Sequence, residues 1–162
     1  MTSSPGPAPP AAELVILVGL PGSGKSTFVR ERFGDRHVHV SRDVLRSERR
    51  QRDAAVAALR AGRSVVVDNV HARAVDRAPW IALGRAHGAR VVGYFVEATA
   101  AEARARNRRR AGRARVPDVA IYVSAKRLTP PAYEEGFDAL YRVRTGTDGC
   151  VVTPIPGRAA TS

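Results

Sequence analysis

The stretch GLPGSGKST, Gly19 to Thr27, holds the residue types that bind a polyphosphate. It fits the pattern G-x-x-x-x-G-K-[ST], with Gly19, Gly24, Lys25 and Ser26 at the fixed positions. Glycines let successive backbone N–H groups turn inward around a phosphate without clashes from Cβ atoms. The lysine would reach the β- and γ-phosphates, and the serine hydroxyl would ligate Mg²⁺. We therefore expect a nucleoside triphosphate to be bound by Gly19, Pro21, Gly22, Ser23, Gly24, Lys25, Ser26 and Thr27.

The surrounding sequence supports this interpretation. An apolar run, Leu14–Leu20, leads into the loop, and its length indicates a strand buried on both faces. A helix after the loop would point its positive N-terminus at the same phosphate. ATP with Mg²⁺ is the expected ligand, and GTP remains an alternative donor, although the guanine-reading pattern N-K-x-D is absent.

A second reactive group is predicted in SRDVLR, residues 41–46, just after the strand-like run His37–Val40. Ligands of an open parallel sheet lie at the carboxyl ends of its strands, so this segment would face the phosphate loop. Asp43 could then accept the proton of an acceptor hydroxyl. Arg42 and Arg46 should keep this carboxylate ionised, and one of them could bind an anionic group of the acceptor. The alternative is that Asp43 only caps the following helix.

The periodicity of the chain predicts a three-layer α/β fold with a parallel sheet. Strands are expected at Leu14–Leu20, His37–Val40, Ser64–Val70, Arg90–Val96 and Asp138–Arg144, and helices at Asp53–Gly62, Ala74–Gly88, Thr99–Arg110 and Val116–Leu128. Thr99 and Glu102 have the spacing of a capping box. We expect one domain over residues 13–152, between disordered tails at 1–12 and 153–162 that are rich in Pro, Ala and Ser.

Charge and cysteine content restrict the class of protein. The net charge is +12, which favours polyanionic partners, although a GC-rich genome would also explain a chain this rich in arginine and alanine. The run Arg104–Arg115 contains no acidic residue. The single cysteine, Cys150, rules out an internal disulfide and is expected to be a small apolar residue. Without an apolar run of about 18 residues or a signal peptide, the chain is expected to be cytoplasmic and away from membranes.

Beyond the phosphate loop, residues 14–144 resemble the kinase domain of the polynucleotide 5′-hydroxyl kinases, the kinase half of the polynucleotide kinase/phosphatase family. The resemblance is carried by GLPGSGKSTF, HVHVSRDVL, AGRSVVVDNV, ARNRRR and VPDVAIYVSAKRLTPPAYEEGFDAL. Its most specific part is PPAYEEGF, which generic P-loop proteins do not require. The resemblance implies a P-loop NTPase fold with a helical, arginine-rich lid.

The resemblance also implies roles for the residues after the second and third strands. Asp43 matches the general base for the 5′-hydroxyl. Arg46 matches an arginine that holds the acceptor's 3′-phosphate in the phage enzyme and is missing from the animal enzyme. Asp68 and Asn69 match the D-[NT] motif, which would place Asp68 near the acceptor or the water shell of Mg²⁺. The alternative is that Asp68 only satisfies backbone N–H groups at the end of its strand.

The lid arginines are implied in the same way. Arg106 and Arg110 match the lid arginines of the phage enzyme, and Arg108 and Arg110 match those of the animal enzyme. Arg110 is common to both, so the resemblance favours it as a catalytic residue beside Lys25 and Asp43. His71, in the loop after Asn69, could also approach the substrate.

The resulting hypothesis is an ATP-dependent kinase that phosphorylates the 5′-hydroxyl of DNA or RNA, with the acceptor bound by Arg42, Asp43, Arg46, Asp68 and Asn69. A P-loop kinase of a metabolite, nucleoside or antibiotic is the alternative within enzymes. A non-catalytic ATP-dependent switch or an RNA-binding module is the alternative outside them, and neither would need Asp43. Oligomeric state and the choice between DNA and RNA stay open.

Overall fold

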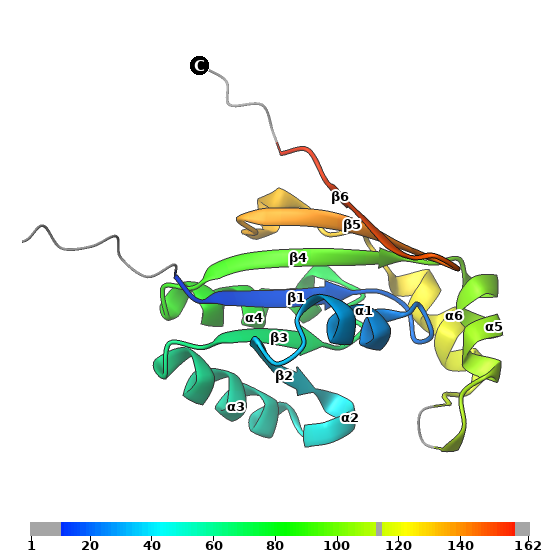
Figure 1. Ribbon diagram of the computed structural model, residues 1–162, viewed down its shortest axis with the longest axis horizontal. Coiled ribbons are helices and arrows are strands. Elements are labelled where there is room, and N and C mark those ends of the chain that lie inside the picture. Colours follow the sequence, from blue (N-terminus) through cyan, green and yellow to red (C-terminus); the bar gives the residue numbers. More distant parts are fainter. Residues whose placement is uncertain (1–10, 113–114, 158–162) are drawn as a thin grey trace, which may run out of the picture.

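The computed structural model describes residues 11–112 and 115–157 (Figure 1). Its elements are β1 (Glu13–Val18), α1 (Lys25–Arg32), β2 (His37–Ser41), α2 (Arg42–Leu45), α3 (Glu48–Arg60), β3 (Ser64–Asp68), α4 (Ala74–Ala86), β4 (Arg90–Glu97), α5 (Ala100–Arg108), α6 (Asp118–Arg127), the 3₁₀ turn η2 (Tyr133–Glu135), β5 (Ala139–Gly146) and β6 (Gly149–Pro154).

The described strands form one six-stranded sheet in the order β2-β3-β1-β4-β5-β6. The pairs from β2 to β5 are parallel, and only β6 is antiparallel to its neighbour, β5. Leu14, Ile16 and Val18 of β1 pack with residues of α3 and α4 on one face. Val15 and Leu17 pack with α1 on the other face. The predicted three-layer α/β fold is confirmed, and the long apolar run is explained by burial on both faces.

The parallel topology brings three functional segments to one edge of the sheet. The phosphate loop follows β1, α2 follows β2, and the loop 69–73 follows β3. Because these strands run the same way, their carboxyl ends lie side by side (Figure 1).

Helices α5 and α6 contact each other in the region predicted to be the lid, and we use that name for residues 100–112 and 115–127. The predicted capping box is present, because Thr99 Oγ1 accepts from the Glu102 amide at 3.1 Å and Glu102 Oε1 accepts from the Thr99 amide at 3.2 Å. A small apolar cluster of Leu20, Ala103 and Ile121 joins the lid to the phosphate loop. A Cβ atom on Gly22 would clash with the Ala103 carbonyl, so this close approach requires glycine.

The structure corrects the predicted limits of the ordered domain. Thr153 and Pro154 belong to β6, a strand that the sequence did not suggest, and the Ile155 amide donates to Leu140 O at 2.9 Å. At the other end, Ala12 O accepts from the Arg90 amide at 2.9 Å. The rest of the predicted tails, residues 1–10 and 158–162, lies outside the described residues. Helix α3 begins at residue 48, earlier than predicted. No helix in the described part of the chain is long and apolar enough to cross a membrane.

Candidate active site

A cavity of about 490 Å³ opens at the carboxyl edge of the sheet, between the phosphate loop, α2, α3, α4 and the lid. Nine of the predicted site residues line it: Pro21, Gly22, Lys25, Ser26, Arg42, Asp43, Asp68, Asn69 and Arg110. The structure thus brings together groups from four separate segments of the chain. Arg46 and Arg106 do not line this cavity.

The phosphate loop has the backbone that its glycines predict. Gly22 and Gly24 have φ angles of 82° and 99°, in the region that favours glycine. Lys25 Nζ donates to the carbonyl oxygens of Gly19 and Leu20, both at 2.8 Å. Burial lowers the pKa of Lys25 to about 8, the charge of Arg110 adds to that shift, and Asp68 and Asp43 oppose it. The charges of Arg110, Asp68 and Asp43 therefore all act on the Lys25 ammonium group.

Asp68 and Ser26 offer two oxygen ligands at the same point. Ser26 Oγ donates to Asp68 Oδ2 at 3.3 Å, and His39 Nε2 lies 3.2 Å from the same oxygen. Burial opposes ionisation of Asp68, but the hydrogen bond from His39 and the charge of Lys25 outweigh it, so the pKa of Asp68 is lowered. An ionised carboxylate beside a hydroxyl fits Mg²⁺, which prefers hard oxygen ligands. No cluster of three His, Cys, Asp or Glu side chains among the described residues could hold a metal ion. Further ligands would therefore come from the nucleotide and water.

Asp43 lies in the first turn of α2, exposed at the cavity wall. The capping residue of this helix is Ser41, whose Oγ accepts from the Val44 amide at 3.4 Å. The simple alternative, in which Asp43 is the cap, is therefore wrong. Asn69 Oδ1 accepts from the Arg42 amide at 3.0 Å and so holds the start of α2 against the end of β3.

The orientation of Asn69 depends on Gln51, a residue that the sequence analysis missed. Asn69 Nδ2 donates to Gln51 Oε1 at 2.8 Å, and Gln51 is buried in the apolar face of α3. A buried glutamine without a partner would be costly, so the pair fixes both side chains. No signal in the sequence pointed to it, because Gln51 lies before the predicted helix start at Asp53.

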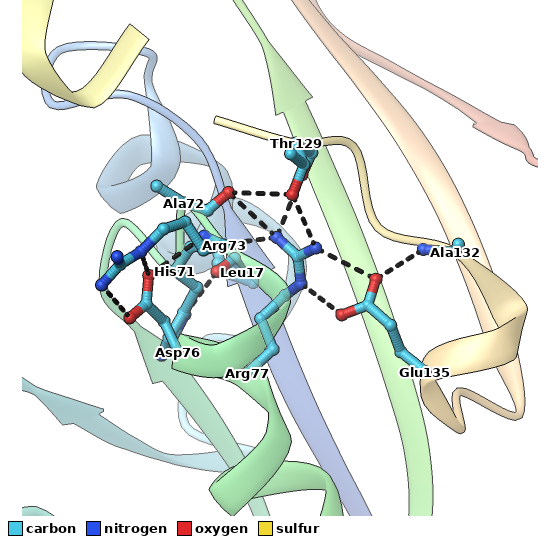
Figure 2. A network of polar contacts seen from close by, with 9 residues as sticks. All are labelled: Leu17, His71, Ala72, Arg73, Asp76, Arg77, Thr129, Ala132 and Glu135. Atoms are coloured by element: carbon cyan, nitrogen blue, oxygen red, sulfur yellow. Dashed lines mark hydrogen bonds and ion pairs between the residues drawn. The ribbon is translucent and has the colours of Figure 1, made fainter. Parts of the chain in front are cut away.

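A polar network around Arg77 fixes the wall formed by the loop after β3 (Figure 2). Arg77, on α4, is fully buried and pairs with Glu135 through two hydrogen bonds, at 2.7 and 3.0 Å. Its Nη1 also donates to the carbonyl oxygens of His71 and Thr129, at 2.8 and 3.0 Å. Glu135 in turn accepts from the Ala132 amide at 2.8 Å. The network explains PPAYEEGF, because this segment delivers the carboxylate that neutralises Arg77.

His71 is part of the same wall. It is one of two non-glycine residues with positive φ among the described residues, at 47°, and its backbone is held by Arg77. Nδ1 lies 2.6 Å from Leu17 O, and Nε2 has no hydrogen-bond partner among the described residues. Burial lowers the pKa of His71 to about 4, so the ring is neutral at physiological pH. The structure places His71 in the cavity wall, where its approach to the substrate stays a prediction.

Comparison with known proteins identifies the family. A family model described as an AAA domain matches residues 14–131. The chain belongs to this AAA-domain family. The bifunctional polynucleotide phosphatase/kinase of Schizosaccharomyces pombe is 30% identical over 129 residues, which are 77% of this chain and 32% of that protein. The chain thus spans about a third of this curated relative's length, and the resemblance inferred from the motifs is confirmed.

Two solved structures show the fold of this AAA-domain protein. Kti12 of Chaetomium thermophilum, in complex with ADP-AlF3, has a TM-score of 0.63 and 18% identity, and covers 84% of this chain and 92% of its own. A gluconokinase of Sinorhizobium meliloti has a TM-score of 0.56 and 18% identity, and covers 82% of each chain. The chain therefore has the nucleotide-binding fold of the P-loop kinases.

In this AAA-domain chain the predicted lid arginines have separate positions. Arg110 lines the cavity, and Arg108 is exposed. Arg106 donates to Ser23 O of the phosphate loop at 3.2 Å and to Thr145 O of β5 at 3.4 Å. Arg106 thus contacts the phosphate loop itself, and its direct contact with a phosphate stays a prediction. Arg46, predicted to hold the acceptor, ends α2 with a φ of 62° and is exposed outside the cavity.

Asn107 fixes the turn that carries Arg110 and was also missed from the sequence. This buried side chain donates from Nδ2 to Val116 O at 2.6 Å and accepts at Oδ1 from the Val116 amide at 3.0 Å. A second link between the two lid helices is Arg104, whose Nε lies 2.9 Å from Asp118 Oδ2. The two contacts join α5 to α6 and hold Arg110 at the cavity.

Proposed function

We propose that the protein transfers the γ-phosphoryl group of ATP to the 5′-hydroxyl of a polynucleotide. The observation that carries the proposal is the shared cavity, in which the carboxylate of Asp43 faces the same space as Lys25, Asp68 and Arg110. A nucleotide switch or binding module would need the phosphate loop alone. It would not need an exposed carboxylate on a helix start that Asn69 and Gln51 hold in position.

The proposed reaction is an in-line displacement at the γ-phosphorus. Asp43 accepts the proton of the acceptor hydroxyl, the acceptor oxygen forms a bond to the γ-phosphorus, and the bond to the β–γ bridging oxygen breaks, so that ADP leaves. Lys25 and Arg110 stabilise the negative charge on the transferring group and on the leaving oxygen. When bound through Ser26 and Asp68, Mg²⁺ would neutralise charge on the triphosphate.

A polynucleotide acceptor is favoured over a small molecule by charge and by similarity. The chain carries a net charge of +12, and Arg42 places a cation at the acceptor side of the cavity. The S. pombe relative, whose name includes polynucleotide kinase activity, is 30% identical over 77% of this chain. A kinase of a neutral metabolite would use the same phosphate loop and Asp43 but would have no use for the positive charge in binding its acceptor.

The test is transfer of label from γ-labelled ATP, with Mg²⁺, to a 5′-hydroxyl oligonucleotide and to the same oligonucleotide already 5′-phosphorylated. Label should appear only on the 5′-hydroxyl strand. Asp43→Asn should lower the rate by about 10²- to 10⁴-fold, as expected for loss of a general base, with ATP binding retained. Asp53→Asn is the matched control, because Asp53 is an exposed carboxylate on α3 that does not line the cavity.

Two outcomes would contradict the proposal. An undiminished rate for Asp43→Asn would remove the base from the mechanism. ATP binding without label on DNA or RNA of any tested length would favour the small-molecule alternative. Salt separates these readings as well, since polynucleotide binding should weaken steeply with salt and a neutral acceptor should respond little.

A further inference from the structure

A second hollow lies at the opposite end of the sheet from the candidate active site. It has a volume of about 460 Å³ and is formed where α1 ends, where β2 begins, and at the amino ends of β1 and β4. We call it the distal hollow. The residues that line it are Arg32, Arg36, Arg90, Phe33, Tyr94, Tyr141, Val92, Glu13 and His37.

The floor of the distal hollow is aromatic. Tyr94 and Tyr141 are stacked, with ring centroids 5.0 Å apart and an angle of 19° between the planes. Phe33 meets Tyr94 edge-on, with centroids 5.6 Å apart. Tyr141 is half-buried, so part of this stack remains accessible. Aromatic rings of this kind accept a stacked nucleobase of any sequence.

The rim of the distal hollow is cationic. Glu13 contacts both Arg90 and His37, each at 3.3 Å, so the carboxylate is already matched by Arg90. Arg32 and Arg36 are exposed, and neither forms an ion pair with a carboxylate in the part of the chain that the structure describes. Arg36 instead donates to the backbone oxygen of Arg32 at 2.7 Å. Two positive charges therefore face the hollow without a carboxylate partner there.

Strand β2 connects the distal hollow to the candidate active site. It is an edge strand, paired in the sheet only with β3. Arg36 directly precedes it, and Arg42, which lines the active-site cavity, directly follows it. At about 3.3 Å per residue the strand spans roughly 17 Å. The side chain of His39, halfway along, is 40% exposed. Arg36, His39 and Arg42 thus place cationic or polar side chains at both ends and in the middle of the edge strand β2.

We propose that the distal hollow binds the acceptor strand a few nucleotides away from the 5′ end that is phosphorylated. The inference rests on the proposed function and specifies where the body of the substrate lies. Phosphates of the strand contact Arg32 and Arg36, and a base stacks on the tyrosine pair. At an axial rise of about 3.4 Å per nucleotide in a stacked strand, roughly 17 Å corresponds to about five nucleotides. Shorter acceptors cannot reach the hollow.

The experiment compares kcat/KM for 5′-hydroxyl oligonucleotides of about three and about fifteen nucleotides. The wild-type protein should prefer the longer acceptor by about tenfold or more. In the double variant Arg32→Ala/Arg36→Ala this preference should fall toward one. The salt dependence for the longer acceptor should also lose about 1.4 units of log–log slope, which is two phosphates at about 0.7 each. Lys126→Ala/Arg127→Ala is the matched control, because it removes the same charge from the exposed end of α6 and should keep the preference.

The outcomes separate this inference from the proposed function. If the Arg32→Ala/Arg36→Ala protein phosphorylates oligonucleotides and keeps the wild-type preference for the longer acceptor, the distal hollow does not bind the acceptor strand. The proposed kinase activity would stand. If both double variants lost the preference for the longer acceptor equally, net charge alone would explain the loss, and this result would also overturn the proposed binding site in the distal hollow. If no oligonucleotide is labelled, the proposed function fails. In that case fluorescence anisotropy measures the affinity for the longer oligonucleotide. Equal affinity of the wild-type and Arg32→Ala/Arg36→Ala proteins would show that the distal hollow does not bind the strand.

Discussion

Replacing Arg77 with alanine should destabilise the domain strongly, and the contacts that it removes give the size of the expected loss in free energy of unfolding. The substitution removes a buried cation and leaves the Glu135 carboxylate, only 14% exposed, with the Ala132 amide as its remaining partner. It also removes the donor to the carbonyl oxygens of His71 and Thr129. Breaking a buried ion pair in this way costs about 3–5 kcal/mol. Since small domains have about 5–15 kcal/mol of total stability, the loss would be a large share of it.

Urea denaturation followed by circular dichroism measures this loss directly. The matched control is Arg73→Ala, in the same segment, whose pair with Asp76 is far more exposed, with side chains 51% and 36% accessible. An exposed pair of this kind contributes about 0–1 kcal/mol. Glu135→Gln should fall between the two, because it keeps the shape and removes the charge. A loss below about 1 kcal/mol for Arg77→Ala would refute the assignment of a tightly coupled buried pair.

The remaining predictions concern the cavity. The pKa of Lys25 is about 8, and a polyphosphate prefers the charged amine. ATP affinity, measured by calorimetry, should therefore fall as the pH rises above about 8. The Lys25→Arg protein keeps its charge and should show no such fall. Arg110→Ala should lower kcat by about a hundredfold or more and change ATP affinity less, whereas the exposed neighbour Arg109→Ala should behave like wild type; equal effects would show that the lid register is wrong. The pKa of His71 is about 4 in the folded protein against 6.5 ordinarily, so the unfolded chain binds the extra proton between these values. Stability should therefore fall as the pH drops from 6.5 toward 4, by up to about 3 kcal/mol, and denaturation midpoints of His71→Asn should lack this part of the pH dependence.

The residues that the sequence placed at one site share one property. Asp68 ends β3, Asp43 lies just after β2, and Lys25 begins the helix that follows β1 and the phosphate loop. Parallel strands bring these carboxyl ends together. Position along the chain was therefore enough to place them in one cavity. The lid arginines were harder to place, because direction matters more than position at the end of a short helix. Arg106 and Arg110 are four residues apart, but α5 ends at Arg108. Arg106 therefore contacts the phosphate loop, whereas Arg110 lies beyond the helix and lines the cavity.

Gln51, Arg77 and Asn107 could not be found from the sequence, because each depends on a partner that only the fold supplies. Gln51 bonds Asn69 across 18 residues, and Arg77 bonds Glu135 across 58. In a chain with 27 cationic residues, a buried arginine has no local signature that separates it from exposed ones. The PPAYEEGF segment was singled out by resemblance, but its physical reason became visible only with Arg77.

These three buried residues give a common account of how the site is held. Each holds a segment that carries a cavity residue. Gln51 bonds Asn69, which holds the start of α2; Arg77 bonds the backbone of the loop after β3; and Asn107 bonds Val116 and so holds the lid turn. The phosphate loop takes its shape from its glycines, and Arg106 contacts it at Ser23 O. The other segments carry side chains that must point inward from exposed helix starts and turns, where the backbone by itself leaves several directions open. A buried polar contact at a fixed distance removes that freedom before the substrate binds, and this preorganisation is what a phosphoryl-transfer site requires, because positioning and electrostatics supply nearly all of its catalysis.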